Sequence, residues 1–201
     1  MDYYESDRKI PEIEEPRTAI HEIYEWVDCI VVAVVFVVLL FTFVFRIVGI
    51  IGPSMKDTLH ENDKIIISNF MYEPEQGDIV VISRNYTNDH GYAYEEPIIK
   101  RVIAVEGQTV DIDFDKGIVY VDGSTLDEPY TRTLTTNRYD VVFPVRIGEN
   151  QVFVLGDNRL ESLDSRSTRI GIVDKRYVLG KAVFRIYPFN KFGGLYGDIK
   201  K

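Results

Sequence analysis

The chain has 201 residues, of which 45% are hydrophobic, and this length suits one membrane segment with one or two folded domains. Its formal net charge of −9 argues against nucleic acid as a partner, because phosphate binding needs a basic surface. The single cysteine, Cys29, cannot form an internal disulfide, and His21, His60 and His90 lack metal-ligand spacing. We therefore expect no metal and no cofactor.

Residues 1–25 form an acidic N-terminal tail that holds eight acidic and three basic side chains. Pro11 and Pro16 lie in this tail, and we expect its first part to be disordered. From about Arg17 to Trp26 the sequence allows a short helix that leads into the next segment.

Residues 29–45 are an apolar run that only Thr42 interrupts. Extended to residues 26–48, the run would make a helix of about 34 Å, which exceeds a hydrocarbon core of about 30 Å. Trp26 and Arg46 stand at its ends, where interfacial side chains belong. A cleaved signal peptide is the alternative, but the preceding tail is acidic and no small-x-small cleavage site follows. We expect a retained transmembrane helix.

Residues 49–201 show short apolar segments separated by turn signals. The predicted strands are Lys64–Ser68, Asp78–Ser83, Pro97–Val105, Thr109–Phe114, Ile118–Val121, Val141–Val145, Val152–Leu155 and Tyr177–Tyr187. Their spacing and their β-branched content predict a mainly β domain behind a single N-terminal helix.

Ser54 follows Gly52 and Pro53 shortly after the apolar run, in a turn-prone setting that favours a bent, exposed backbone. A serine in such a setting is often only a turn residue. The polar stretch from Gly156 to Arg166, which directly follows a predicted strand, is equally typical of a solvated loop. As a functional loop, it would supply hydroxyls and carboxylates that orient a neighbouring base.

Lys100 and Arg101 stand on opposite faces of the predicted strand Pro97–Val105, and both faces are otherwise apolar. This pattern indicates a strand that is buried on two sides. Burial lowers the pKa of a lysine, and a neutral amine can take a proton from a serine hydroxyl. The alternative is that Lys100 reaches solvent while Arg101 makes a structural ion pair.

Four motifs, taken in chain order, resemble those of type I signal peptidases. They are Gly52-Pro53-Ser54-Met55, Gly77-Asp78-Ile79-Val80, Lys100-Arg101-Val102-Ile103, and Gly156-Asp157-Asn158-Arg159 followed by Ser162 and Asp164-Ser165-Arg166. The segments Val119-Tyr120-Val121-Asp122-Gly123 and Glu128-Pro129-Tyr130 resemble the family between the motifs. The resemblance covers roughly residues 26–196. One such motif is weak evidence, whereas four in the family's order behind one anchor are strong evidence.

The resemblance implies a membrane-anchored serine endopeptidase that removes signal peptides from secreted preproteins, cutting after small residues through a Ser–Lys dyad. Ser54 would be the nucleophile and Lys100 the general base. Ser162 would hydrogen-bond the lysine and position it. The other implied site residues are Asp157, Arg101, Asp164 and Arg166, which would hold the site together, and Gly52, Pro53, Met55 and Ile98, which would lie at the substrate.

The implied fold is an antiparallel β catalytic core over residues 49–201, with a smaller β cap inserted at about residues 111–146. The implied partners are preprotein signal peptides and the lipid bilayer, with the catalytic domain on the extracytoplasmic side. Basic residues near the two ends of the anchor lean weakly towards the opposite orientation.

Three departures from the family's pattern stand out. Asp57 occupies a position that is usually proline, and the glycine after the last motif, Gly171, comes later than usual. In part of the family a serine adds a hydroxyl donor to the oxyanion site at the position held here by Gly52.

Two rival hypotheses remain. A self-cleaving repressor shares the Ser–Lys chemistry, but it would need a DNA-binding domain, and residues 1–48 show neither a basic face nor a helix-turn-helix pattern. The other rival is a non-catalytic or narrow-specificity homologue that acts in pilus or surface-protein assembly. Loss of Ser54 or Lys100 would have favoured the non-catalytic form, and both are present.

Overall fold

The computed structural model describes residues 19–83, 87, 91 and 96–196. Most of the predicted acidic tail and the loop that contains His90 therefore lie outside the described residues. The chain divides into two compact units, residues 1–40 and residues 41–201.

The N-terminal helix α1 (Ala19–Phe43) contains a span, Ile20–Phe43, that is long and apolar enough to cross a membrane. The span has 24 residues, and none of it is buried inside the protein. The helix begins seven residues before the predicted segment 26–48 and ends five residues before that segment does. The predicted C-terminal boundary of the helix is therefore wrong.

The last part of the apolar run forms strand β1 (Phe45–Gly49) instead of helix. It pairs with β2 (Lys64–Ser68), so that Phe45 lies opposite Ser68 and Gly49 opposite Lys64. Valine and isoleucine suit a pleated strand, and periodicity cannot separate a helix from a strand within a continuous apolar run. Val48 of β1 packs against a core cluster, which favours the strand.

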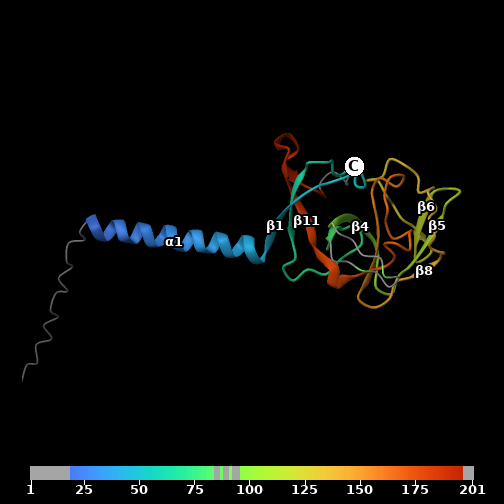
Figure 1. Cartoon of the computed structure of the whole chain (residues 1–201), viewed down its shortest axis with the longest axis horizontal. Helices are drawn as coiled ribbons and strands as arrows, with labels where there is room; N and C mark the ends of the chain where they lie inside the picture. Colours follow the sequence, from blue (N-terminus) through green and yellow to red (C-terminus); the bar gives the residue numbers. More distant parts are fainter. Residues whose placement is uncertain (1–18, 84–86, 88–90, 92–95, 197–201) are drawn as a thin grey trace, which may run out of the picture. The chain divides into compact units, whose positions relative to one another are not determined.

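The main sheet has eight strands and is antiparallel at every pairing. Its order is β1-β2-β11-β3-β4-β9-β10, and β12 pairs with β11 (Figure 1). The further strands are β3 (Ile79–Ile82), β4 (Ile98–Val105), β9 (Gln151–Leu155), β10 (Val173–Asp174), β11 (Val178–Tyr187) and β12 (Gly193–Gly194), with 3-10 helices η1 (Lys175–Tyr177) and η2 (Phe189–Lys191).

A second sheet has four antiparallel strands in the order β7-β6-β5-β8. The strands are β5 (Thr109–Asp113), β6 (Ile118–Val121), β7 (Ser124–Thr125) and β8 (Val145–Arg146). This sheet spans residues 109–146, close to the cap expected at 111–146. The predicted strand Val141–Val145 is wrong over most of its length. Val142 is exposed, and Pro144 has no N–H to donate to a ladder.

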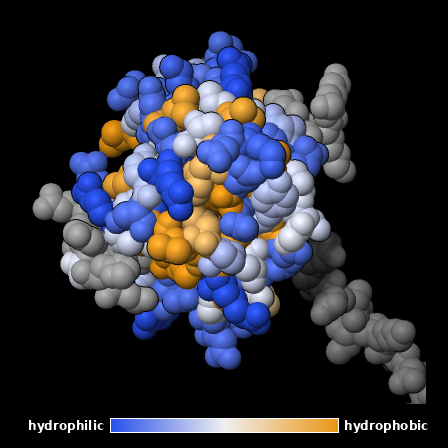
Figure 2. All heavy atoms as spheres, turned by 90° about the vertical axis from the view of Figure 1, so that its right-hand side faces the viewer, coloured by the Kyte–Doolittle hydropathy of each residue, from blue (hydrophilic) through white to orange (hydrophobic). Residues whose placement is uncertain are grey.

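Strand β4 connects the three hydrophobic clusters of the core. Ile99 belongs to one cluster, Val102 to the second, and Ile103 and Ala104 to the third. The strand is therefore buried on both faces, as its sequence predicts. The face of the protein seen in Figure 2 is mainly hydrophilic, with a group of hydrophobic residues near its centre.

Candidate active site

Ser54 lies in a tight turn that begins just after β1. The N–H of Lys56 donates to the Pro53 carbonyl at 2.9 Å, and the N–H of Leu59 donates to the Met55 carbonyl at 2.8 Å. The Ser54 carbonyl accepts a hydrogen bond from the N–H of Asn158 at 3.0 Å. The turn leaves the serine half-exposed and fixes its backbone from the loop that follows β9.

Lys100 reaches Ser54 from the buried interior of β4. Its side chain is 4% exposed, which excludes the alternative that the amine extends into solvent. Nζ donates to Ser54 Oγ at 2.9 Å and to the carbonyl of Ile99 at 3.0 Å. The first distance lies within the range for proton transfer between a hydroxyl and a base.

Burial lowers the pKa of Lys100 from 10.5 to about 8, because the apolar surroundings disfavour the charged amine. Asp164 and Asp157 oppose this effect, since each carboxylate attracts the ammonium form. Desolvation outweighs the two carboxylates. A useful fraction of the amine is therefore neutral near pH 7 to 8, and its lone pair can accept a proton.

Arg101 turns to the other face of β4 and pairs with Asp157. Its Nε and Nη2 atoms donate to the two carboxylate oxygens at 2.8 and 2.6 Å, and Nη1 donates to the Gly77 carbonyl at 2.8 Å. The guanidinium lies 3.9 Å from the centre of the Tyr130 ring. Thr58 also donates to Asp157, so this one carboxylate joins β4 to the turn that carries the serine.

The loop after β9 is shaped by a second buried ion pair. Arg166 Nε and Nη2 donate to the two carboxylate oxygens of Asp164 at 2.8 and 2.9 Å. Asp164 also accepts from the N–H of Gly156 at 3.1 Å, while Arg166 donates to the Arg159 carbonyl at 2.7 Å. Both charged side chains are fully buried, so each compensates the other in a place that water cannot reach.

Ser162 lies beside the dyad but does not bind the lysine as expected. A Cβ on Gly156 would stand 2.2 Å from Ser162 Oγ and 2.5 Å from the Ser54 carbonyl oxygen, so only glycine lets these segments approach. Ser162 Oγ is buried and has no hydrogen-bond partner among the described residues. The amine of Lys100 donates to Ser54 and Ile99, and the expected bond to Ser162 is not formed.

A groove of about 380 Å³ opens beside Ser54 and Lys100. The residues that line it are Val48, Gly49, Ile50, Ile51, Ser54, Val81, Glu96, Pro97, Ile98, Ile99 and Lys100. Ile98, which we expect to contact the substrate, lines this groove. Gly52 and Pro53 flank the serine without lining the groove, and Met55, which is 1% exposed, packs into the core instead.

Backbone geometry explains two departures from the family's pattern. Gly52 has φ of 83°, a left-handed conformation that would strain a serine at this position. Asp57 has φ of 85°, whereas proline is locked near −65° and could not adopt this turn. Asp57 instead pairs with Arg132 at 3.3 Å.

Glu128 and Thr58 have no predicted role from sequence patterns, although both support the site. Glu128 accepts from the guanidinium of Arg159, which is fully buried, and Arg159 Nε in turn donates to the Gly156 carbonyl at 3.1 Å. The resemblance at Glu128-Pro129-Tyr130 was the available signal, but local sequence does not tell which buried cation a distant carboxylate will meet.

Comparison with known proteins identifies the family of the chain. Residues 23–187 match the family model for signal peptidase, peptidase S26. A signal peptidase I of Bacillus licheniformis is 33% identical in an alignment of 184 positions that covers 85% of this chain and 92% of that protein. A probable signal peptidase I-1 of Synechocystis is 37% identical in an alignment of 177 positions that covers 86% of this chain and 87% of that protein. A crystal structure of a signal peptidase I from Enterococcus faecalis is 26% identical, covers 55% of this chain and 97% of its own, and superposes with a TM-score of 0.42.

The chain belongs to the peptidase S26 family of signal peptidases. It is therefore a serine peptidase, a hydrolase that acts on peptide bonds.

Proposed function

We propose that this chain is a membrane-anchored endopeptidase that removes N-terminal signal peptides from secreted preproteins, with Ser54 as nucleophile and Lys100 as general base. The observation that carries the proposal is the 2.9 Å contact between Lys100 Nζ and Ser54 Oγ, made by an amine that is almost completely buried. The names of the relatives support the substrate class, since they are signal peptidases.

Lys100 transfers protons in both halves of the reaction. Neutral Lys100 takes the hydroxyl proton as Ser54 Oγ attacks the carbonyl carbon of the scissile bond. The ammonium returns that proton to the leaving amine when the C–N bond breaks, which leaves an ester on Ser54. Lys100 then takes a proton from a water that attacks the ester and passes it to Ser54 Oγ as the ester bond breaks, which releases the signal peptide with a new carboxylate.

The groove accounts for the expected substrate. An extended peptide lying between the segment before Ser54 and the start of β4 can make main-chain hydrogen bonds in the manner of an added strand. Apolar side chains, including Ile50 and Ile98, form its walls, and the volume of about 380 Å³ is small. Such walls admit small residues next to the cut and exclude large ones.

The negative charge on the attacked carbonyl oxygen needs preorganised donors. The N–H of Ser54 is the donor that we assign to it. Gly52 carries no hydroxyl, and its positive φ leaves no unstrained place for one, so a second donor from this position would have to be a backbone N–H.

The ion pairs give the supporting residues their proposed roles. Arg101 with Asp157, and Arg166 with Asp164, hold β4, the serine turn and the loop after β9 in register. Ser162 offers a buried hydroxyl with unused hydrogen-bonding capacity. We infer that its hydroxyl oxygen accepts a hydrogen bond from Lys100 once the amine is protonated and Ser54 Oγ has formed the acyl bond.

Helix α1 supplies the proposed anchor, with the catalytic domain on the extracytoplasmic side, where translocated preproteins emerge. Its length and composition allow it to span a bilayer. Only a single residue separates the helix from β1, so the catalytic domain would be tethered at the membrane surface. The tether would raise the effective concentration of the enzyme for bonds cut at that surface.

The test is cleavage of a model preprotein by the detergent-solubilised chain, with mass spectrometry of the new N-terminus. We expect Ser54→Ala and Lys100→Met each to abolish cleavage while circular dichroism shows a folded protein. Lys116→Met removes an exposed amine on the cap and should cut at the parental rate. Parental activity in either dyad variant would refute the assigned role. Cleavage restricted to pilin-type precursors would favour the narrow-specificity alternative.

A further inference from the structure

Among the described residues, the groove beside the dyad is lined by a single carboxylate. Besides Ser54 and Lys100, its lining residues are valine, isoleucine, glycine and proline, with Glu96 as the one exception. Glu96 is exposed, and no ion pair to it is formed by the described residues. The other charged group in the lining, Lys100, already contacts Ser54 Oγ and the Ile99 carbonyl.

The position of Glu96 along the chain limits its distance from Lys100. It precedes Lys100 by four residues, and β4 begins at Ile98. Extended backbone rises about 3.3 Å per residue, so Glu96, which precedes the strand, lies at most about 13 Å from Lys100. A bound peptide of the same rise therefore meets Glu96 with the fourth or fifth residue before the cut.

Between these two points the groove wall is apolar. Pro97, Ile98 and Ile99 follow Glu96 on one side, and residues 48–51 supply the other. A substrate side chain held there gains from burial and not from charge. A cation positioned farther from the cut would meet the carboxylate at the rim, while an acidic residue would be repelled by it.

We propose that Glu96 is a specificity-determining residue that selects preproteins with lysine or arginine at the fourth or fifth position before the cut and disfavours aspartate or glutamate there. The inference rests on the proposed function, because it assigns the groove to the signal-peptide side of the substrate. The role of Glu96 concerns which peptides the enzyme cleaves and does not change the proposed reaction of Ser54 and Lys100.

The experiment uses the full chain in detergent with peptides that differ only at one position, moved from the third to the seventh residue before the cut. Each position carries lysine, glutamine or glutamate, and kcat/KM is measured in low salt and in 0.5 M salt. We expect lysine to exceed glutamate by about three- to tenfold at the fourth or fifth position, as for a solvent-exposed pair, and the ratio to shrink in high salt.

Two variants of Glu96 test whether this side chain causes the preference for lysine over glutamate. Glu96→Gln should bring the ratio of lysine to glutamate peptides close to one, and Glu96→Lys should invert it. Glu149→Gln removes an exposed carboxylate outside the groove and should keep both the parental ratio and the parental rate on the glutamine peptide.

The outcomes separate the two proposals. An unchanged lysine preference in Glu96→Gln, or equal rates for all three peptides with the parental chain, would overturn the role of Glu96. In both cases cleavage of the glutamine peptide would leave the proposed function standing. Failure of the parental chain to cut any peptide or preprotein would instead count against the proposed function itself.

Discussion

Among single residues, Lys100 is the proposed base because its buried environment disfavours the charged form of its amine. The same burial that lowers its pKa to about 8 also costs folding free energy whenever the amine is charged. A protein that buries this amine is therefore less stable than a variant in which the amine is replaced by an uncharged side chain.

Lys100→Met should accordingly be more stable than the parental protein near pH 7. A pKa of about 8 in place of 10.5 corresponds to about 3 kcal/mol, a net value that already includes the attraction to Asp164 and Asp157. The unfolded chain binds more protons than the folded chain between pH 8 and 10.5, so parental stability rises across that window. The difference between the two proteins should be largest below pH 8 and vanish above 10.5.

Thermal unfolding of both proteins from pH 6 to 10.5 measures this difference. A variant that is less stable than the parent at pH 7 would show that Lys100 contributes more through its contacts than burial costs. Lys116→Met is the matched control, because that amine is exposed and its removal should change stability little.

The sequence could predict Ser54 and Lys100 because motif order and two-sided burial of one strand both point to them. It could not predict where Met55 and Ser162 point. A buried methionine one position after the nucleophile depends on the turn geometry, and that geometry here includes Asp57 in a left-handed conformation. The hydrogen bond of Ser162 depends on where Lys100 directs its amine, which is a property of the packed site.

Among the elements, the junction of α1 and β1 shows a boundary that hydropathy alone does not predict. The run from Cys29 to Val48 is apolar except for Thr42 and Arg46, yet it divides at Val44 into a helix and an edge strand. Whether a valine-rich segment becomes helix or strand depends on a partner, and the paired residues of β2 are fifteen or more positions away in the sequence. Strands such as Lys64–Ser68 and Ile118–Val121, bounded by turn residues, were predicted with correct ends.

Two truncations test that junction. A fragment of residues 44–201 keeps β1 and should fold with the thermal stability of the domain in the full chain. A fragment of residues 50–201, cut near the boundary that hydropathy predicts, loses β1 and leaves the edge of β2 unpaired. We expect it to be less stable by about 2 kcal/mol or more, because the packing of Val48 is lost with the strand.

Denaturant titration of the two fragments supplies the measurement. Equal midpoints would show that residues 45–49 contribute nothing to the domain and that the helix could extend to the predicted end. The longer fragment should also cut soluble peptides, since it retains Val48 and Gly49 of the groove.

Across the whole catalytic domain, the cap and the core are joined by buried charge. Glu128 comes from the segment between β7 and β8, and its carboxylate binds Arg159 in the loop after β9. The same carboxylate also accepts a hydrogen bond from the hydroxyl of Tyr130. The insertion of a cap near residues 111–146 could be predicted by resemblance. The contact that fixes it to the core could not, because it pairs residues 31 positions apart that carry no common local signal.

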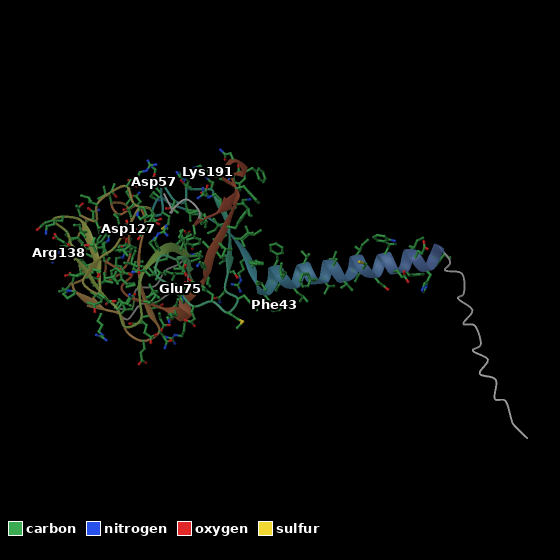
Figure 3. All side chains as sticks on the ribbon, turned by 180° about the vertical axis from the view of Figure 1, so that it is seen from behind. Phe43, Asp57, Glu75, Asp127, Arg138 and Lys191 are labelled. Atoms are coloured by element: carbon green, nitrogen blue, oxygen red, sulfur yellow. The ribbon has the colours of Figure 1, made fainter. Side chains whose placement is uncertain are left out.

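Glu128→Gln should destabilise the domain by about 3 kcal/mol, because it leaves the guanidinium of Arg159 fully buried without its counter-charge. Asp127→Asn makes the same change in charge at the exposed neighbouring residue, which Figure 3 labels, and should stay within about 0.5 kcal/mol of the parent. Urea denaturation compares the three proteins. Similar losses in both variants would mean that net charge, and not the buried pair, is responsible.

The most direct test of the account is the pH dependence of kcat/KM for a neutral peptide substrate. Because Lys100 acts as a base only when it is uncharged, the rate should rise about tenfold per pH unit in acid and level off near pH 8, where its pKa lies. A profile that stays flat from pH 6 to 10, or that bends near 10.5 as for a solvated lysine, would contradict the assignment of a buried, neutral Lys100 as the base for Ser54.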